Sequence, residues 1–121
     1  MNSNQNPLKD KSYSFALLII KTYKAIIVDS REYVLSKQLL RSGTSIGANI
    51  EEANRAESKN DFIHKLSIAN KEAAETEYWI RLLRDSEVVD IKSSKTLLNH
   101  CDELLKMLTS SIKTAKQNRN I

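Results

Sequence analysis

The sequence predicts an all-α protein, an antiparallel four-helix bundle whose helices run up, down, up and down. The chain of 121 residues is long enough for one ordinary domain and contains only 2 glycines and 1 proline. A sheet-rich fold needs more turn residues than this between its many short strands. Apolar residues recur every three or four positions along four long stretches, which is typical of amphipathic helices. The polar joints between the stretches are short, so consecutive helices must run antiparallel.

The domain organisation follows from where this periodicity begins and ends. Residues 1–11 are polar and hold the only proline, so we expect a flexible N-terminal tail. A single bundle domain is expected over residues 12–118, and a short C-terminal tail over residues 119–121. No signal peptide is recognisable, and no apolar run reaches the roughly 18 residues that a membrane span needs. The chain has 1 cysteine and therefore no internal disulfide, so we expect a cytoplasmic protein without membrane contact.

The first helix is expected over residues 12–28 and is apolar around most of its circumference. A helix of this kind must be covered on more than one side. The bundle core covers one side, and a second protein chain is the simplest cover for the rest. We therefore expect this helix to pack against other helices or other subunits through Leu17, Ile19, Ile20 and Tyr23.

The second helix is expected over residues 31–57, with Asp29 and Glu32 at the spacing of a capping box. Gly43 and Gly47 lie four residues apart on one face, although each glycine costs a helix about 1 kcal/mol relative to alanine. Small residues at this spacing let another backbone approach closely. That backbone belongs either to the first helix or to a neighbouring subunit, and the sequence leaves both open. A phosphate-binding glycine loop is disfavoured, because its lysine and its preceding strand are missing.

The last two helices have recognisable starting points. The third helix is expected to begin near Ser58 or Asn60 and to end near Ser86. The fourth is expected to be capped by Asp90 and to fray from Lys116 onward. On the second, third and fourth helices the positions with bundle-seam spacing are Leu35, Leu39, Ser42, Ile46, Asn49 and Ala53; Phe62, Leu66, Ala69, Ala73, Thr76, Ile80 and Leu83; and Leu97, Cys101, Leu104 and Leu108.

Polar residues flank the seam between the second and third helices. With the turn near Glu57, residues whose numbers sum to about 115 should lie level across this antiparallel pair. Such residues could form a buried polar site, or a ladder that fixes the register of the helices, and the second interpretation is favoured. The expected cross-helix ladder consists of Arg41, Ser45, Asn49, Glu52, Asn70 and Glu75.

We expect no catalytic residue, no cofactor and no metal site. A di-iron bundle needs a Glu-x-x-His pair on two of its helices, whereas Asp61 precedes His64 and Leu97 precedes His100 at that spacing. Cys101 and His100 do not form a pair, because adjacent residues of a helix point about 100° apart. No Ser-His-Asp set can be argued from these 2 histidines. The sequence therefore favours a non-enzymatic protein.

Positive charge gathers at one end of the expected bundle. The formal net charge is +4, and the start of the first helix, the turn after the second and the end of the fourth helix meet at this end. Clustered lysine and arginine are typical of proteins that bind nucleic-acid phosphates, although basic groups at a helix C-terminus also complement its dipole. Few aromatic side chains are available for base stacking, so any binding of RNA or DNA should be non-specific. The expected contacts are Lys9, Lys11, Lys113, Lys116 and Arg119.

Two internal stretches resemble a known family. They are EYVLSKQLLRSGTSIGANIEEA, residues 32–53, and residues 62–83, which contain KEAAETEYW. These stretches are similar to bacterial four-helix-bundle proteins, some of which are encoded in intervening sequences of 23S ribosomal RNA genes. The resemblance implies an all-α bundle and a homo-oligomer, with a ring of five subunits as the expected form. A related group, the accessory variability proteins of diversity-generating retroelements, is thought to engage nucleic acid and a reverse transcriptase through a basic barrel.

Two functional hypotheses follow from the sequence. The first is an oligomeric, non-enzymatic bundle that binds RNA or DNA through backbone phosphates. The second is a scaffold for protein–protein assembly with no nucleic-acid role, which uses the first helix and the small-residue face as its contact surface. The expected partners are therefore further copies of the chain, RNA or DNA, or another protein.

Overall fold

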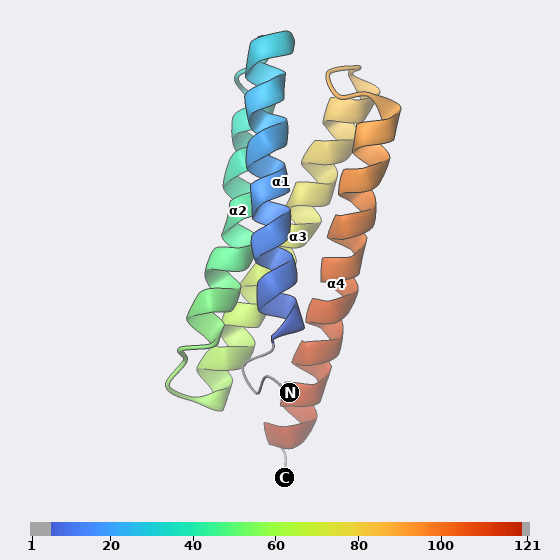
Figure 1. Ribbon diagram of the computed structural model, residues 1–121. Helices are drawn as coiled ribbons and strands as arrows, with labels where there is room; N and C mark the ends of the chain where they lie inside the picture. The colour runs from blue at the N-terminus through green and yellow to red at the C-terminus, as the bar shows by residue number, and fades with distance from the viewer. Residues whose placement is uncertain (1–5, 120–121) are drawn as a thin grey trace.

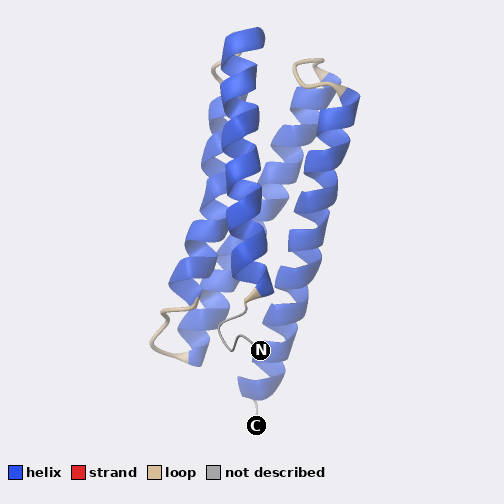
Figure 2. Ribbon diagram, viewed as in Figure 1, coloured by secondary structure: helices blue, strands red, loops and turns tan. Residues whose placement is uncertain are grey.

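The fold consists of four long helices, without any strand in the residues 6–119 that the computed structural model describes (Figures 1 and 2). The helices are α1 (Pro7–Asp29), α2 (Leu35–Ala53), α3 (Lys59–Asp85) and α4 (Ile91–Arg119). Neighbouring helices run in opposite directions (Figure 1). We call the end with the loops 30–34 and 86–90 the loop end, and the end where α1 begins and α4 finishes the terminal end. The predicted all-α, four-helix fold is confirmed.

α1 begins earlier than the sequence predicted because its first turn is capped. The Asn6 side chain accepts a hydrogen bond from the Lys9 N–H at 3.1 Å. Pro7 follows in the first turn, where its missing amide proton is not needed. Residues 7–11 are helical, so their assignment to a flexible tail is wrong. The remaining parts of the two predicted tails, residues 1–5 and 120–121, lie outside the described residues.

The start of α2 also differs from the prediction. Arg31, its expected first residue, has a left-handed backbone with a φ of 52°, which interrupts the helical path between α1 and α2. Glu32 does not form a capping box with Asp29, and instead caps α2 from outside the helix. Its carboxylate accepts hydrogen bonds from three backbone N–H groups, those of Val34, Leu35 and Ser36, at 3.0, 2.9 and 2.7 Å.

The other helix ends are set by short local hydrogen bonds. α2 stops at Ala53, before the predicted Glu57, because the Ala56 N–H bonds back only three residues, to the Ala53 carbonyl at 3.1 Å. The Ser58 hydroxyl accepts from the Asp61 N–H at 3.0 Å and caps α3. The Asp90 carboxylate accepts from the Ser93 N–H at 2.7 Å and caps α4. These two predicted starts are confirmed.

The core runs along the bundle axis and receives apolar side chains from all four helices. Most positions with the predicted seam spacing are buried. The first turn of α3 is an exception, because Phe62 is half-buried and the neighbouring Ile63 is buried instead. The largest fully buried apolar side chains are Ile19, Leu39, Ile46, Ile50, Leu66, Ile80, Leu83, Leu97, Leu104 and Leu108.

Cys101 belongs to this core. Its side chain is 0% exposed, and its thiol donates a hydrogen bond to the Ala73 carbonyl of α3 at 3.2 Å. Burial, with smaller contributions from the carboxylates of Glu77 and Asp102, raises the pKa of the thiol to about 12. Cys101 is therefore a packing residue that stays protonated at neutral pH.

The two glycines of α2 allow α1 to approach closely. A Cβ atom on Gly43 would lie 2.8 Å from Cγ1 and 2.9 Å from Cγ2 of Ile19, so a larger residue does not fit there. A Cβ atom on Gly47 would meet the Ser12 Oγ at 3.4 Å, which is an ordinary contact. The small-residue face of α2 therefore packs against α1 of the same chain, which resolves the alternative that the sequence left open.

Candidate interaction surfaces

The outer face of α1 carries an exposed apolar stripe. Tyr13, Leu17 and Val28 are 64%, 53% and 73% exposed, and with Lys24 they lie on one side of the helix because they are four, seven and four residues apart. We call these four residues the α1 stripe. Lys24 is its single charged member and forms no ion pair within the described part of the chain.

The residues predicted for an interface fall into different environments. Leu17 lies on the α1 stripe, and Ile20 and Tyr23 are half-buried beside it. Ile19 is 0% exposed and packs on Gly43, so of the two expected roles it has the contact with another helix of the same chain and not one with another subunit. Gly47 likewise faces α1 and not a second chain.

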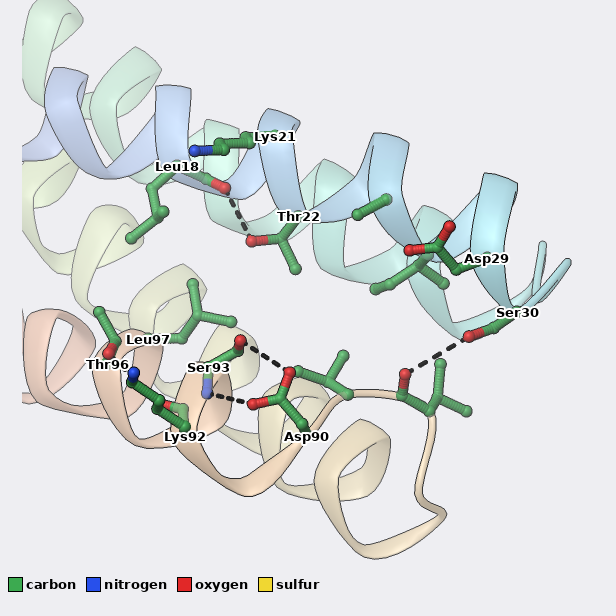
Figure 3. A pocket seen from close by; sticks show the side chains of 14 residues that line it. Leu18, Lys21, Thr22, Asp29, Ser30, Asp90, Lys92, Ser93, Thr96 and Leu97 are labelled. Atoms are coloured by element: carbon green, nitrogen blue, oxygen red, sulfur yellow. Dashed lines mark hydrogen bonds between the residues drawn. The ribbon is translucent and has the colours of Figure 1, made fainter.

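A cleft separates α1 from α4 toward the loop end (Figure 3). The two helices are joined nearer the terminal end, where the Lys11 Nζ lies 2.6 Å from a Glu103 carboxylate oxygen. The cleft has a volume of about 580 Å³, which is in the range of ligand-sized cavities. Its apolar lining is Leu18, Ala25, Ile26, Val88, Val89 and Leu97, and its polar lining is Lys21, Thr22, Asp29, Ser30, Asp90, Lys92, Ser93 and Thr96.

Most hydroxyl and carboxylate groups of the cleft already have partners. The Thr22 hydroxyl donates to the Leu18 carbonyl at 2.8 Å. Hydrogen bonds from the backbone and side chain of Ser93 lower the pKa of Asp90 and hold its carboxylate on α4 (Figure 3). By contrast, the Asp29 carboxylate has no hydrogen-bond or ion-pair partner among residues 6–118, and so it is the available anion of the cleft.

This cleft was not predicted from the sequence, although polar residues of α4 indicate it. The α4 residues that line the cavities along α1 are Lys92, Ser93, Thr96, Leu97 and His100, and all of them except Leu97 are polar. A tightly packed helix pair carries apolar residues at such positions. Polar residues on the face of α4 that is turned toward the largely apolar α1 therefore indicate that the two helices do not pack together along their whole length.

The predicted ladder between α2 and α3 forms in part. The Arg41 guanidinium forms ion pairs with Glu75 and, at 3.3 Å, with Glu72. The Trp79 indole N–H donates to Glu75 at 2.9 Å, and this bond, followed by those from Arg41, lowers the pKa of the Glu75 carboxyl despite its partial burial. The Lys65 ammonium lies 2.8 Å from Glu52, which is the other cross-helix contact made by a residue of the predicted ladder.

The other ladder residues do not join the two helices. The Ser45 hydroxyl donates to the Arg41 carbonyl at 2.6 Å, and the Asn49 amide donates to the Ser45 carbonyl at 2.8 Å, both within α2. The side-chain oxygen of Asn70 is buried and has no hydrogen-bond partner within the described range. Ser45 and Asn70, whose numbers sum to 115 and which should lie level across the two helices, are therefore not paired: the Ser45 hydroxyl bonds to the backbone of its own helix instead.

The basic residues at the terminal end are only partly available. Lys9 lies 3.9 Å from Glu51, and Lys11 is paired with Glu103. Lys113 and Lys116 are exposed and have no ion-pair partner in the part of the chain that the structure describes. The Arg119 side chain lies outside the described residues.

Comparison with known proteins establishes the family. The family model described as 23S rRNA-intervening sequence protein matches residues 4–110. The chain belongs to this family. It is also similar, with a TM-score of 0.87 and 51% identity, to the crystal structure of a protein of unknown function from the S23 ribosomal protein family of Bacteroides thetaiotaomicron, over 88% of this chain and 98% of that chain. No curated protein matches the chain.

The segment that matches the family includes some candidate surfaces of this 23S rRNA-intervening sequence protein and leaves out others. The α1 stripe, the α1–α4 cleft and the Arg41–Glu75 contact all lie within residues 4–110. Lys113, Lys116 and Arg119 lie after the matched segment. Among the described residues, none of the helices is both long and apolar enough to span a bilayer, and no three His, Cys, Asp or Glu side chains are placed to share a metal ion.

Proposed function

We propose that this 23S rRNA-intervening sequence protein is a non-enzymatic scaffold of the cytoplasm that assembles with further copies of itself through the α1 stripe. The exposure of Tyr13, Leu17 and Val28 on one face of α1 carries this proposal. Three large apolar side chains exposed on one face of a single helix are a candidate protein-contact surface. We expect a closed ring of five subunits, as the resemblance to the family implies.

The shifted ionisable groups support a structural role. Glu32 and Asp90, whose pKa values are lowered, cap helices, and Glu75 belongs to the contact between α2 and α3. The shifts of Arg84 and Asp85 arise from their ion pair with each other at an exposed helix end. A catalytic centre usually gathers several perturbed groups in one cleft, whereas here each such group has a local structural partner.

The test is the mass of the protein in solution. We expect light scattering after size exclusion to give an oligomer for the wild type and a monomer for Leu17→Glu, with equal helical content by circular dichroism. A charge within the stripe must be desolvated on assembly, which is costly without a partner. Tyr78→Glu is the matched control, because Tyr78 is a partly exposed aromatic residue on α3 and outside the stripe. A monomeric wild type, or an oligomer that is unaffected by Leu17→Glu, would contradict the proposal.

A second candidate function is binding of nucleic-acid phosphates at the terminal end. It is favoured by the exposed side chains of Arg55, Lys59, Lys113 and Lys116, which a ring with parallel subunits would bring together. Binding of this kind weakens steeply with salt and ignores sequence. We expect Lys113→Glu with Lys116→Glu to weaken binding of any RNA, and Lys9→Glu to have less effect because Lys9 already faces Glu51. Absence of RNA binding at low salt would exclude this candidate and leave the scaffold.

A further inference from the structure

We infer that the α1–α4 cleft is the surface that receives the α1 stripe of a second copy, so that the subunits associate head to tail. The inference rests on the proposed self-assembly and identifies its counter-surface. In this arrangement two different surfaces of the chain meet in each contact, and every subunit contributes both.

The cleft and the stripe match in length and in chemistry. Along α1 the cleft extends from Leu18 to Ser30, or about 18 Å at 1.5 Å per residue, and the stripe extends from Tyr13 to Val28 over about 22 Å. The apolar part of the cleft lining comes from both helices and from the loop between α3 and α4. An amphipathic helix laid into an apolar groove is a recurrent mode of protein recognition.

Charge favours the cleft over a second stripe as the partner. A contact between two stripes would place each Lys24 among tyrosine, leucine and valine, without a carboxylate to pair with it, and burial of an unpaired ammonium is costly. The cleft offers the Asp29 carboxylate, which is likewise unpaired among the residues that the structure describes. The other charged groups of the rim are Lys21, Lys92 and the capping Asp90, so the rim as a whole does not repel a single added lysine.

The geometry of α1 separates the two surfaces. Leu17 lies on the stripe and Leu18 lines the cleft, and consecutive residues of a helix point about 100° apart. The stripe therefore cannot fold back into the cleft of its own chain. Contacts between two different surfaces of identical subunits generate a ring when the rotation closes and a filament when it does not.

Complementation between two defective variants tests the arrangement. Leu17→Glu damages the stripe and keeps the cleft, whereas Thr96→Arg fills the cleft and keeps the stripe, because Thr96 is an exposed lining residue. We expect each variant alone to be monomeric by sedimentation, and an equimolar mixture to form a dimer with one intact contact. Thr109→Arg is the control, because Thr109 is exposed on α4 away from the cleft and its variant should assemble as the wild type does.

Disulfide trapping gives a second readout that does not depend on the folding of Thr96→Arg. We expect a mixture of Leu17→Cys and Thr96→Cys to yield a covalent heterodimer under mild oxidation, while the buried Cys101 does not compete. Assembly that persists in Thr96→Arg, or efficient cross-linking of Leu17→Cys alone, would overturn the head-to-tail arrangement and leave the proposed self-assembly intact. A wild type that remains monomeric would overturn the proposed function itself.

Discussion

Single atoms decide which of the two glycines can be replaced. Gly43→Ala would place a methyl group 2.8 Å from a branch carbon of Ile19, which is fixed in the core. We expect Gly43→Ala to lower the free energy of unfolding by roughly 1–3 kcal/mol, because overpacking outweighs the gain of about 1 kcal/mol in helix propensity. Gly47→Ala is the matched variant, with a 3.4 Å contact, and should be neutral or stabilising. Urea denaturation measures both, and equal effects would contradict the packing argument.

Glu32 gives the protein a pH-dependent contribution to stability. Burial raises the pKa of its carboxyl, but hydrogen bonds from Leu35, Ser36 and Val34 outweigh this effect and lower the pKa overall. A carboxyl with a lowered folded-state pKa stabilises the protein above its unfolded-state pKa of about 4.3 and loses this contribution as the pH falls through the folded-state value.

We therefore expect Glu32→Gln to reduce the free energy of unfolding by about 1 kcal/mol at pH 7, the usual effect of a lost helix cap. The difference from the wild type should start to shrink below the unfolded-state pKa of about 4.3, because the unfolded chain then takes up a proton that the folded carboxyl, with its lowered pKa, does not. Denaturation curves at pH 7 and pH 3 measure this, and a difference of equal size at both pH values would show that the ionised cap is not responsible.

At the scale of the helices, the end of α3 contains a side chain where glycine is preferred. Glu87 has a φ of 63°, its N–H donates to the Arg84 carbonyl, and the Val88 N–H donates to the Leu83 carbonyl at 2.9 Å. This is the Schellman pattern of a helix C-terminus. We expect Glu87→Gly to raise the free energy of unfolding by about 1 kcal/mol, because glycine lacks the Cβ that disfavours left-handed backbone.

Ser86→Gly is the control for this helix end, because Ser86 has a φ of −88° and gains nothing from glycine. It should destabilise the protein by roughly 0.5–1 kcal/mol through the added freedom of the unfolded chain. Thermal unfolding followed by circular dichroism distinguishes the two variants, and a shift in the same direction for both would argue against backbone strain at Glu87.

A buried hydroxyl pair fixes α2 against α3. The hydroxyl oxygens of Ser42 and Thr76 are 2.9 Å apart in the core, and Thr76 also lies 2.7 Å from the Glu72 carbonyl. We expect Thr76→Val to cost about 1–3 kcal/mol, because it leaves the Ser42 hydroxyl buried without its partner. The double variant with Ser42→Ala should cost less than the sum of the two single variants, and a double-mutant cycle in urea measures this coupling. Additive effects would mean that the pair does not act as a unit.

Helix boundaries were predictable where one side chain carries the cap. Ser58 and Asp90 are visible as caps in the sequence, and both act as such. The starts of α1 and α2 were not predictable in this way. Proline occurs both in tails and in the first turn of a helix, and the turn at Arg31 depends on a left-handed backbone that the residue type does not indicate.

The candidate surfaces, like the helix boundaries, were predictable from the sequence only in part. An excess of apolar residues around the first helix predicted a face that its own bundle does not cover, and Leu17 lies on that face. Ile19 could not be distinguished from Leu17 without the orientation of the helix. The α1–α4 cleft depends on how far two helices diverge, which is a property of their packing and not of a local pattern.

At the scale of the whole molecule, assembly should make stability depend on protein concentration. Association stabilises the folded state by mass action, so the Tm of the wild type should rise over a hundredfold increase in concentration. Leu17→Glu should show no such rise, whereas Tyr78→Glu should follow the wild type. Scanning calorimetry at several concentrations measures this, and a concentration-independent Tm for the wild type would indicate that the α1 stripe stays in water.

The burial of the one thiol has a practical consequence for measuring motion within the bundle. The Cys101 side chain of α4 is buried against the Ala73 carbonyl of α3, and burial raises its pKa to about 12. At neutral pH the thiol is therefore both inaccessible to an alkylating reagent and protonated. Alkylation therefore requires an opening in which α3 and α4 separate. Because the chain has 1 cysteine, and where reclosing is faster than alkylation, the modification rate relative to that of a free thiol gives the fraction of molecules in the open state in native buffer, without any denaturant or added label.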